Sequence, residues 1–169
     1  NKPFLEAPEG EYLTDRLTGE ANSFIREHSG EDFFLYLPYY AVHSPLEGKR
    51  HLVEKYKKKG GTPCQGNPVY AAMVENLDSC IGSVLNTLKE SGLEENTVVI
   101  FTSDNGGVLR ITCQDPLRAG KGSYYEGGIR VPLIIRWPGH IRKGSVSDVP
   151  VVNMDFYPTI LDIIGREPE

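Results

Sequence analysis

Three short apolar runs most strongly constrain what this chain can fold into. They are "DFFLYLPYY" (residues 32–40), "TVVIFTS" (97–103) and "RVPLIIRW" (130–137). Each has the length of a strand, and a continuous apolar run is typical of a strand that is covered on both faces. A fourth, weaker strand is predicted in "DVPVVNMD" (148–155).

Helical patterns separate these runs. The first predicted helix begins with Thr14 as its N-cap and ends at Gly30. Its apolar face consists of Leu17, Ala21, Phe24 and Ile25. Asp155 is predicted to cap a last helix, "FYPTILDIIG", which tolerates Pro158 in its first turn.

The clearest helical pattern lies between the first two runs. Asn67 is its predicted N-cap, Pro68 occupies the first helical position, and Gly92 ends it. Its apolar positions, in alternating steps of four and three, are Tyr70, Val74, Leu77, Ile81, Val84 and Leu88.

Strands that alternate with helices predict an α/β fold with a mixed, largely parallel sheet flanked by helices. The length of 169 residues corresponds to a single domain. Two predicted loops, 41–66 and 103–128, are long for a compact domain, and such loops are usually functional or disordered.

Composition excludes several partners. The net charge is −5 and the pI is near 5.4, which gives no electrostatic case for nucleic acid. The basic run 55–61 is predicted to be a solvated helix end and loop. No apolar stretch is long enough to span a bilayer. The three cysteines, Cys64, Cys80 and Cys113, contain no CxxC pair and allow at most one disulfide; Cys80 is expected in the core.

Polar residues follow two of the predicted strands. His43 lies just beyond the first, and Asp104 and Asn105 end the second, where two glycines follow. Ligands of open α/β sheets bind beyond the carboxyl ends of the strands. Carboxylate and amide oxygens suit Ca²⁺ or Mg²⁺, and Lys121 between two glycines in "GKGSYYEGG" is typical of an anion-binding loop.

Each of these features also has an ordinary structural interpretation. "DNGG" is typical of an Asx turn, a histidine before Ser-Pro is often a loop residue, and a lysine between glycines is often solvated. Ca²⁺ needs about six to eight oxygens, so Asp104 and Asn105 cannot complete a site. "GxSxG" is absent, which excludes the serine-hydrolase arrangement, and Asp115 stands where a P-loop needs its first glycine.

Together the motifs resemble the type I sulfatases of the alkaline phosphatase-like superfamily. The resemblance covers nearly the whole chain and rests on "FFLYLPYYAVHSP", "YAAMVENLDSCIGSVLNTLKESGLEENTVVIFTSDNGG" and "PLRAGKGSYYEGGIRVPLIIRWPG". It implies an arylsulfatase-like sulfuric ester hydrolase. It further implies that His43 and Lys121 are catalytic residues that bind the sulfate group, and that Asp104 and Asn105 ligate Ca²⁺ rather than Mg²⁺.

The family's nucleophile is a formylglycine made from a cysteine or serine in C-x-P-S-R, and no such motif is present. In "CQDPLR", which begins at Cys113, the proline and arginine each come one place too late. The paired aspartates that complete the family's metal site are absent as well. We therefore expect residues 1–169 to be a fragment of a larger catalytic domain, without the N-terminal part of that domain. We expect this fragment to be inactive alone and to self-associate through an exposed sheet edge.

Two other functions stay open. The first is a non-catalytic, sulfatase-derived module, which a search for C-x-P-S-R upstream in the gene would distinguish. The second is a phosphatase or phosphodiesterase of the same superfamily, although its two-zinc members place a histidine where this chain has Asn105. The expected partner is a sulfated small molecule or a sulfated glycan. No N-x-S/T sequon occurs, which favours a periplasmic or secreted bacterial protein.

Overall fold

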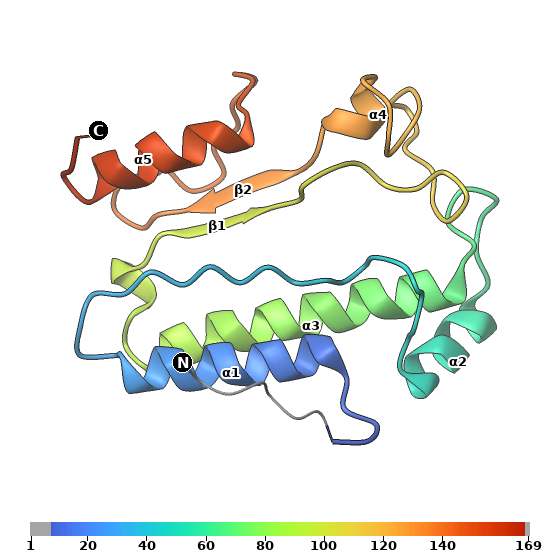
Figure 1. The fold of residues 1–169 in the computed structure, drawn as a ribbon, viewed down its shortest axis with the longest axis horizontal. Helices are drawn as coiled ribbons and strands as arrows, with labels where there is room; N and C mark the ends of the chain where they lie inside the picture. Colours follow the sequence, from blue (N-terminus) through green and yellow to red (C-terminus); the bar gives the residue numbers. More distant parts are fainter. Residues whose placement is uncertain (1–7, 168–169) are drawn as a thin grey trace.

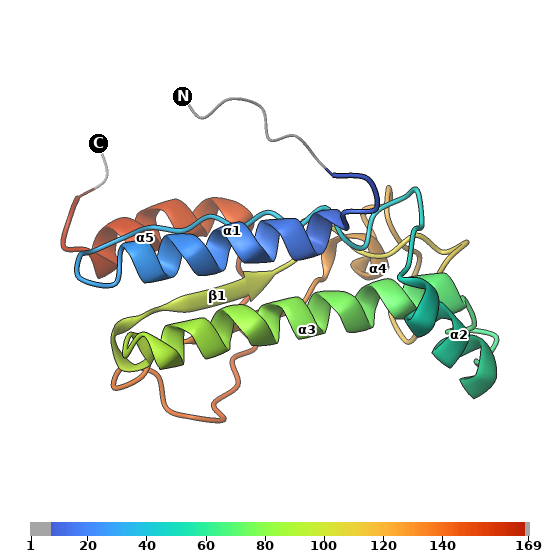
Figure 2. The same cartoon turned by 90° about the horizontal axis from the view of Figure 1, so that it is seen from below.

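The computed structural model describes residues 8–167. Its elements, in chain order, are α1 (Leu13–Glu27), α2 (Arg50–Lys59), α3 (Pro68–Glu90), the 3₁₀ turn η1 (Glu94–Asn96), β1 (Val99–Thr102), α4 (Glu126–Ile129), β2 (Leu133–Arg136), the 3₁₀ turn η2 (Asn153–Asp155) and α5 (Phe156–Ile163). Helices α1 and α3 lie side by side, and α5 lies beyond the β1–β2 pair (Figure 1). Figure 2 shows β1 between α3 on one side and α1 and α5 on the other.

The core lies between α1 and α3. The side chains that are buried there come from one face of each helix: Thr14, Thr18, Ala21 and Ile25 of α1, and Ala72, Met73, Asn76, Cys80, Thr87 and Leu88 of α3. Small and polar side chains predominate, so the two helices approach closely. The buried position of Cys80, which is 7% exposed, confirms the sequence prediction.

The predicted start of α1 is wrong by two residues. The N-cap is Tyr12, and Thr14 lies inside the first turn with 5% of its surface exposed. The Thr18 hydroxyl donates to the Thr14 carbonyl oxygen at 2.7 Å. Thr14 is therefore buried in the contact with α3, and the Thr14 hydroxyl does not cap the helix.

The ends of α3 agree with the prediction. The Asn67 carboxamide oxygen accepts hydrogen bonds from the amides of Val69 and Tyr70, each at 3.0 Å, and Pro68 begins the helix. After the last turn Gly92 adopts a left-handed φ of +71°, and the Leu93 amide donates to the Leu88 carbonyl oxygen at 2.9 Å. This is the glycine-terminated arrangement that the sequence predicts.

The buried face of α3 coincides only in part with the predicted apolar positions: Leu88 is buried, but the other buried residues lie outside the predicted set. Val74, one of the predicted apolar positions, is 44% exposed, whereas Asn76 is 3% exposed. The Asn76 carboxamide donates to the Asp15 carboxylate at 3.1 Å, so its burial leaves this donor satisfied. The sequence pattern predicts an apolar stripe but not which neighbour the helix will meet.

Strands β1 and β2 form an antiparallel pair, in which Ile100 is paired with Ile135. The described part of the sheet is therefore not the largely parallel one expected. The cause is the connection between the strands, which is a loop closed at its base. Gly106 donates its amide to the Gly128 carbonyl oxygen at 2.9 Å, so the chain returns beside the strand that it left.

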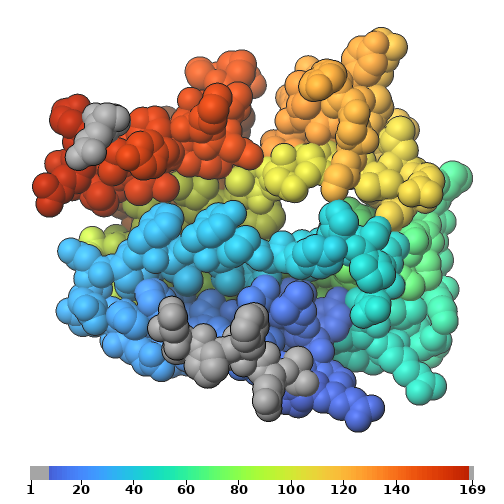
Figure 3. Space-filling model, in the orientation of Figure 1, coloured from blue at the N-terminus to red at the C-terminus, as the bar shows by residue number. Residues whose placement is uncertain are grey.

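The first apolar run is extended but belongs to no sheet among residues 8–167. Its side chains alternate between half-buried and exposed, and Phe34 and Tyr36 are 68% and 76% exposed. The half-buried face packs on α1, where the Tyr39 and Thr18 hydroxyls lie 2.9 Å apart. Figure 3 shows this segment as a cyan band across the surface. The predicted cover on both faces is thus present on one face only.

The C-terminal predictions are met in part. Residues 148–155 form no strand; they end in η2 and are exposed. The Asp155 carboxylate accepts the amide of Val152 at 2.8 Å, so it caps η2 and makes no capping bond to α5. Pro158 lies in the first turn of α5, where its missing amide hydrogen costs no helical bond. Within residues 8–167 no helix is both long and apolar enough to cross a membrane.

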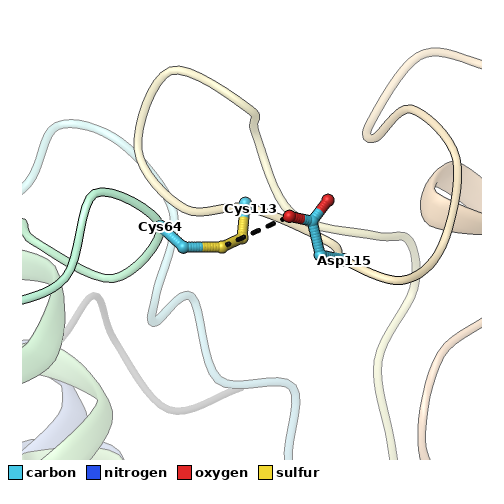
Figure 4. Close-up of side chains that lie close together, drawn as sticks. All are labelled: Cys64, Cys113 and Asp115. Carbon is cyan, nitrogen blue, oxygen red and sulfur yellow. Dashed lines mark hydrogen bonds between the residues drawn. A yellow bond between two sulfur atoms is a disulfide. The ribbon is translucent and has the colours of Figure 1, made fainter.

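A disulfide joins the loop before α3 to the loop after β1. Cys64 and Cys113 have Cα atoms 5.1 Å apart, and the Cys113 amide donates to the Cys64 carbonyl oxygen at 3.1 Å (Figure 4). Beside it the Thr112 hydroxyl donates to the Gln65 side-chain oxygen at 2.9 Å. Asp115 lies next to the two sulfur atoms, but the disulfide occupies both, so this cluster is a covalent staple and not a metal centre.

Removal of the disulfide is expected to destabilise the protein. Replacing Cys64 and Cys113 together by serine should lower the free energy of unfolding by about 2 to 4 kcal/mol, because the bond restrains a long stretch of the unfolded chain. Thermal unfolding with and without dithiothreitol measures this, and the double variant is the control because it has no bond to reduce. If reductant leaves the unfolding temperature of the wild-type protein unchanged, the staple does not contribute to stability.

A second prediction concerns acid. Burial disfavours the charge on Asp15, but hydrogen bonds from Lys49 and Asn76 outweigh it and hold the pKa of this carboxyl below its ordinary value of 3.8. Because the folded pKa is the lower one, the stabilisation is present above pH 3.8 and is lost as the pH falls below it.

Asp15→Asn should therefore destabilise the protein at neutral pH and reduce the loss of stability below pH about 4. Unfolding temperature measured against pH tests this, with Asp148→Asn at an exposed carboxylate as the control. Equal acid sensitivity of the two variants would contradict the assignment to Asp15.

Candidate functional site

The candidate site is built on the loop between β1 and β2. Two backbone hydrogen bonds close its base: Gly106 N–H donates to the Gly128 carbonyl oxygen and Lys121 N–H to the Gly107 carbonyl oxygen, both at 2.9 Å. The second bond holds the main chain of Lys121 beside the "DNGG" turn. These segments, which are separated in sequence, meet at the base of the loop.

Glycine is required where two stretches of backbone within this loop cross. A Cβ atom at Gly106 would collide with the Gly127 carbonyl oxygen, and one at Gly127 would collide with the carbonyl oxygen of Ala119. The glycines of "DNGG" and "YEGG" therefore allow two stretches of backbone to touch. They are needed for packing, in addition to any approach of a ligand.

Asp104 and Asn105 lie directly after β1, where the sequence places them. The Asp104 side chain is exposed, Asn105 is half-buried, and the Ser103 hydroxyl donates to the Asn105 carbonyl oxygen at 3.1 Å. No ion pair neutralises Asp104 among residues 8–167. Their oxygens are of the kind that a hard cation such as Ca²⁺ prefers, but they supply only part of a coordination shell.

Lys121 is exposed on the outer turn of the loop. It follows Gly120, whose neighbours leave no room for a side chain, and precedes Gly122, which has a left-handed φ of +87°. Within the described part of the chain its ammonium group forms no ion pair. An exposed cation on a backbone fixed at Gly107 is suited to bind an anion.

His43 lies in the turn that follows the extended segment 33–40. Its amide donates to the Tyr40 carbonyl oxygen at 3.0 Å, and its Nδ1 lies 2.7 Å from the Ser44 carbonyl oxygen. A carbonyl oxygen only accepts, so the hydrogen of the neutral ring is on Nδ1 and Nε2 is the acceptor. The Tyr40 ring packs 5.0 Å from the imidazole, which fixes its orientation further.

The structure thus brings three of the four predicted residues together on one loop framework. Asp104 and Asn105 precede the glycine that Lys121 hydrogen-bonds, whereas His43 stands on a separate turn. Among residues 8–167 no hydrogen bond or ion pair joins His43 to the other three.

The sequence prediction missed two features of this loop. The disulfide staples the loop at Cys113, and the guanidinium carbon of Arg118 lies 3.7 Å from the centre of the Tyr125 ring. Three cysteines allow three pairings, and two neighbouring tyrosines differ in surroundings but not in type. The expected burial of Cys80 leaves Cys64 and Cys113 available, but nothing in the sequence shows that they bond or which tyrosine faces Arg118.

Comparisons with known proteins identify the family of the chain. The family described as Sulfatase matches residues 1–166. A protein named "Sulfatase" from Formosa agariphila is 44% identical over 99% of this chain and 32% of its own length. Human steryl-sulfatase is 36% identical over 90% of this chain and 26% of its own length.

A solved structure also matches closely. The crystal structure of Ps i-CgsB in complex with k-i-k-neocarrahexaose has a TM-score of 0.88 and 37% sequence identity over 98% of this chain and 37% of that one. The chain spans between about a quarter and a third of the length of the curated relatives above. By sequence and by fold, it belongs to the sulfatase family and forms part of an alkaline phosphatase-like sulfatase domain.

Proposed function

We propose that the full-length protein hydrolyses sulfuric esters and that residues 1–169 supply part of its cation-binding and sulfate-binding site. The observation that supports this most directly is the hydrogen bond from Lys121 N–H to the Gly107 carbonyl oxygen. It holds an exposed cationic residue beside the turn that carries Asp104 and Asn105, in a chain of the sulfatase family.

The roles follow from the chemistry of these groups. Lys121 binds the sulfate oxygens through its ammonium group, which has no competing ion pair among residues 8–167. His43, whose Nδ1–H is held by the Ser44 carbonyl oxygen, turns Nε2 toward the ester oxygen; the imidazolium form carries a second hydrogen on Nε2, and in that form the ring donates a hydrogen bond or its proton to the leaving oxygen. The orientation of Nε2 thus depends on the turn that holds Nδ1.

Asp104 and Asn105 would hold Ca²⁺, together with ligands from outside residues 1–169. A bound divalent cation supplies positive charge that stabilises negative charge on the sulfate oxygens. The chain contains no C-x-P-S-R motif, and we propose that the formylglycine nucleophile comes from another part of the protein. Residues 1–169 alone therefore lack the group that attacks the ester and are inactive.

For the substrate we propose a sulfated glycan. The supporting observation is the similarity, at 37% identity, to a structure solved with the saccharide k-i-k-neocarrahexaose. The relatives named steryl-sulfatase, at 36% identity, make a small hydrophobic sulfate ester the second candidate. Hydrolysis of sulfated oligosaccharides compared with a steroid sulfate, both by the full-length enzyme, distinguishes the two.

Lys121→Met in the full-length protein should lower kcat/KM for an aryl sulfate by about tenfold to a hundredfold, because it removes a charged hydrogen-bond donor from the sulfate group. Release of the phenol measures the rate. Lys143→Met, at an exposed lysine on the turn after β2, is the matched control and should leave kcat/KM unchanged. Equal effects of the two variants would overturn the assignment of Lys121.

Asp104→Ala should weaken Ca²⁺ binding by about tenfold or more, because a carboxylate is lost from the coordination shell. The rise in unfolding temperature as Ca²⁺ is added to metal-free protein measures this affinity. Asp148→Ala removes an exposed carboxylate elsewhere and should leave the titration unchanged. If Asp104→Ala titrates like the wild-type protein, the cation does not bind at this turn.

A further inference from the structure

Arg118 and Tyr125 form the closest cation–π contact of the described residues. The guanidinium carbon lies 3.7 Å from the ring centre, well inside the distance of about 6 Å within which such pairs attract. Arg118 forms no ion pair among residues 8–167, and the nearby acid Glu126 instead pairs with Arg130 at 3.3 Å. The tyrosine ring is therefore the contact that holds this arginine.

The stack lies at the closed end of the segment that carries Lys121. The Arg118 carbonyl oxygen accepts the Gly127 amide at 2.8 Å, so main-chain and side-chain contacts join the same two stretches of chain. A further turn is fixed between them by the Ser123 amide, which donates to the Gly120 carbonyl oxygen at 3.1 Å.

The two neighbours of Lys121 have no side chains that could restrain it. Gly120 and Gly122 flank it, and glycine has the widest choice of backbone conformations. The position of Lys121 is therefore set by main-chain hydrogen bonds, its own to Gly107 and that of Ser123 to Gly120, and by the Arg118–Tyr125 stack.

We propose that Arg118 and Tyr125 are positioning residues that act through Lys121. This inference rests on the proposed function, because it assumes that Lys121 binds the sulfate group. Without the stack, the turn that bears Lys121 explores more conformations, and a smaller fraction of molecules holds the ammonium group where the sulfate needs it. A smaller competent fraction raises the apparent dissociation constant by the same factor.

The adjacent tyrosines provide a matched pair for the test. Tyr124 is 97% exposed and Tyr125 is 48% exposed. Of the two rings, only that of Tyr125 stacks on the Arg118 guanidinium. In the full-length protein, Tyr125→Leu should raise both KM for an aryl sulfate and the inhibition constant of inorganic sulfate about threefold, as expected for an exposed cation–π contact. Tyr125→Phe keeps the aromatic face and should retain wild-type values, and Tyr124→Leu should change neither constant.

The decisive measurement combines Tyr125→Leu with Lys121→Met in one double variant. In a Lys121→Met background, Tyr125→Leu should have no further effect on either constant, since the stack then has nothing to position. An equal threefold loss in that background would overturn the inference and show that the stack supports the fold in general. Arg118→Met repeats the test from the other partner while keeping an apolar side chain, and it decides the result if Tyr125→Leu does not fold.

The same experiment separates the sulfate-binding role of Lys121 from the positioning role of Arg118 and Tyr125. If Lys121→Met alone leaves both constants unchanged, the sulfate-binding role of Lys121 is wrong. If Lys121→Met raises both constants but neither Tyr125→Leu nor Arg118→Met does, the sulfate-binding role stands and the positioning role is wrong.

Discussion

The hydrogen bond from the Lys121 amide to the Gly107 carbonyl oxygen is the contact on which the candidate site depends. It converts a long connection between two strands into a closed loop and places the main chain of Lys121 beside the turn that begins with Asp104 and Asn105. Glycine is needed for this approach, because a Cβ atom at Gly120 would lie 2.6 Å from the Gly107 carbonyl oxygen, and Gly106 and Gly127 likewise touch other backbone where a Cβ atom would stand. The glycine pattern and the chemistry of the loop therefore have one structural cause.

Around this contact the structure uses three kinds of restraint. The disulfide at Cys113 is covalent and anchors the tip of the loop; the bonds of Gly106 and Lys121 are main-chain and close its base; the stack of Arg118 on Tyr125 is a side-chain contact and holds the outer turn. Each acts on a different part of the loop. The surface position of Lys121 thus does not imply that its main chain is free.

Local features of the fold were predictable, and pairings across the chain were not. The cap at Asn67 and the stop at Gly92 depend on neighbouring residues, and both are present. The antiparallel pairing of β1 and β2 depends on how the loop closes, which no periodicity in either strand encodes. In the same way, residue type and family resemblance single out Asp104 and Lys121 as candidates, but the partners of Cys113 and Tyr125 required coordinates.

The extended segment 33–40 offers a way to detect whether another strand pairs with it in the full-length protein. Most of its amides donate to no described backbone group, and one row of its side chains, including Phe34 and Tyr36, faces outward. Amides without a partner exchange their hydrogens with water quickly, whereas amides in a completed sheet exchange slowly. Deuterium uptake across this one segment therefore reports, peptide by peptide, whether another strand has been added beside it.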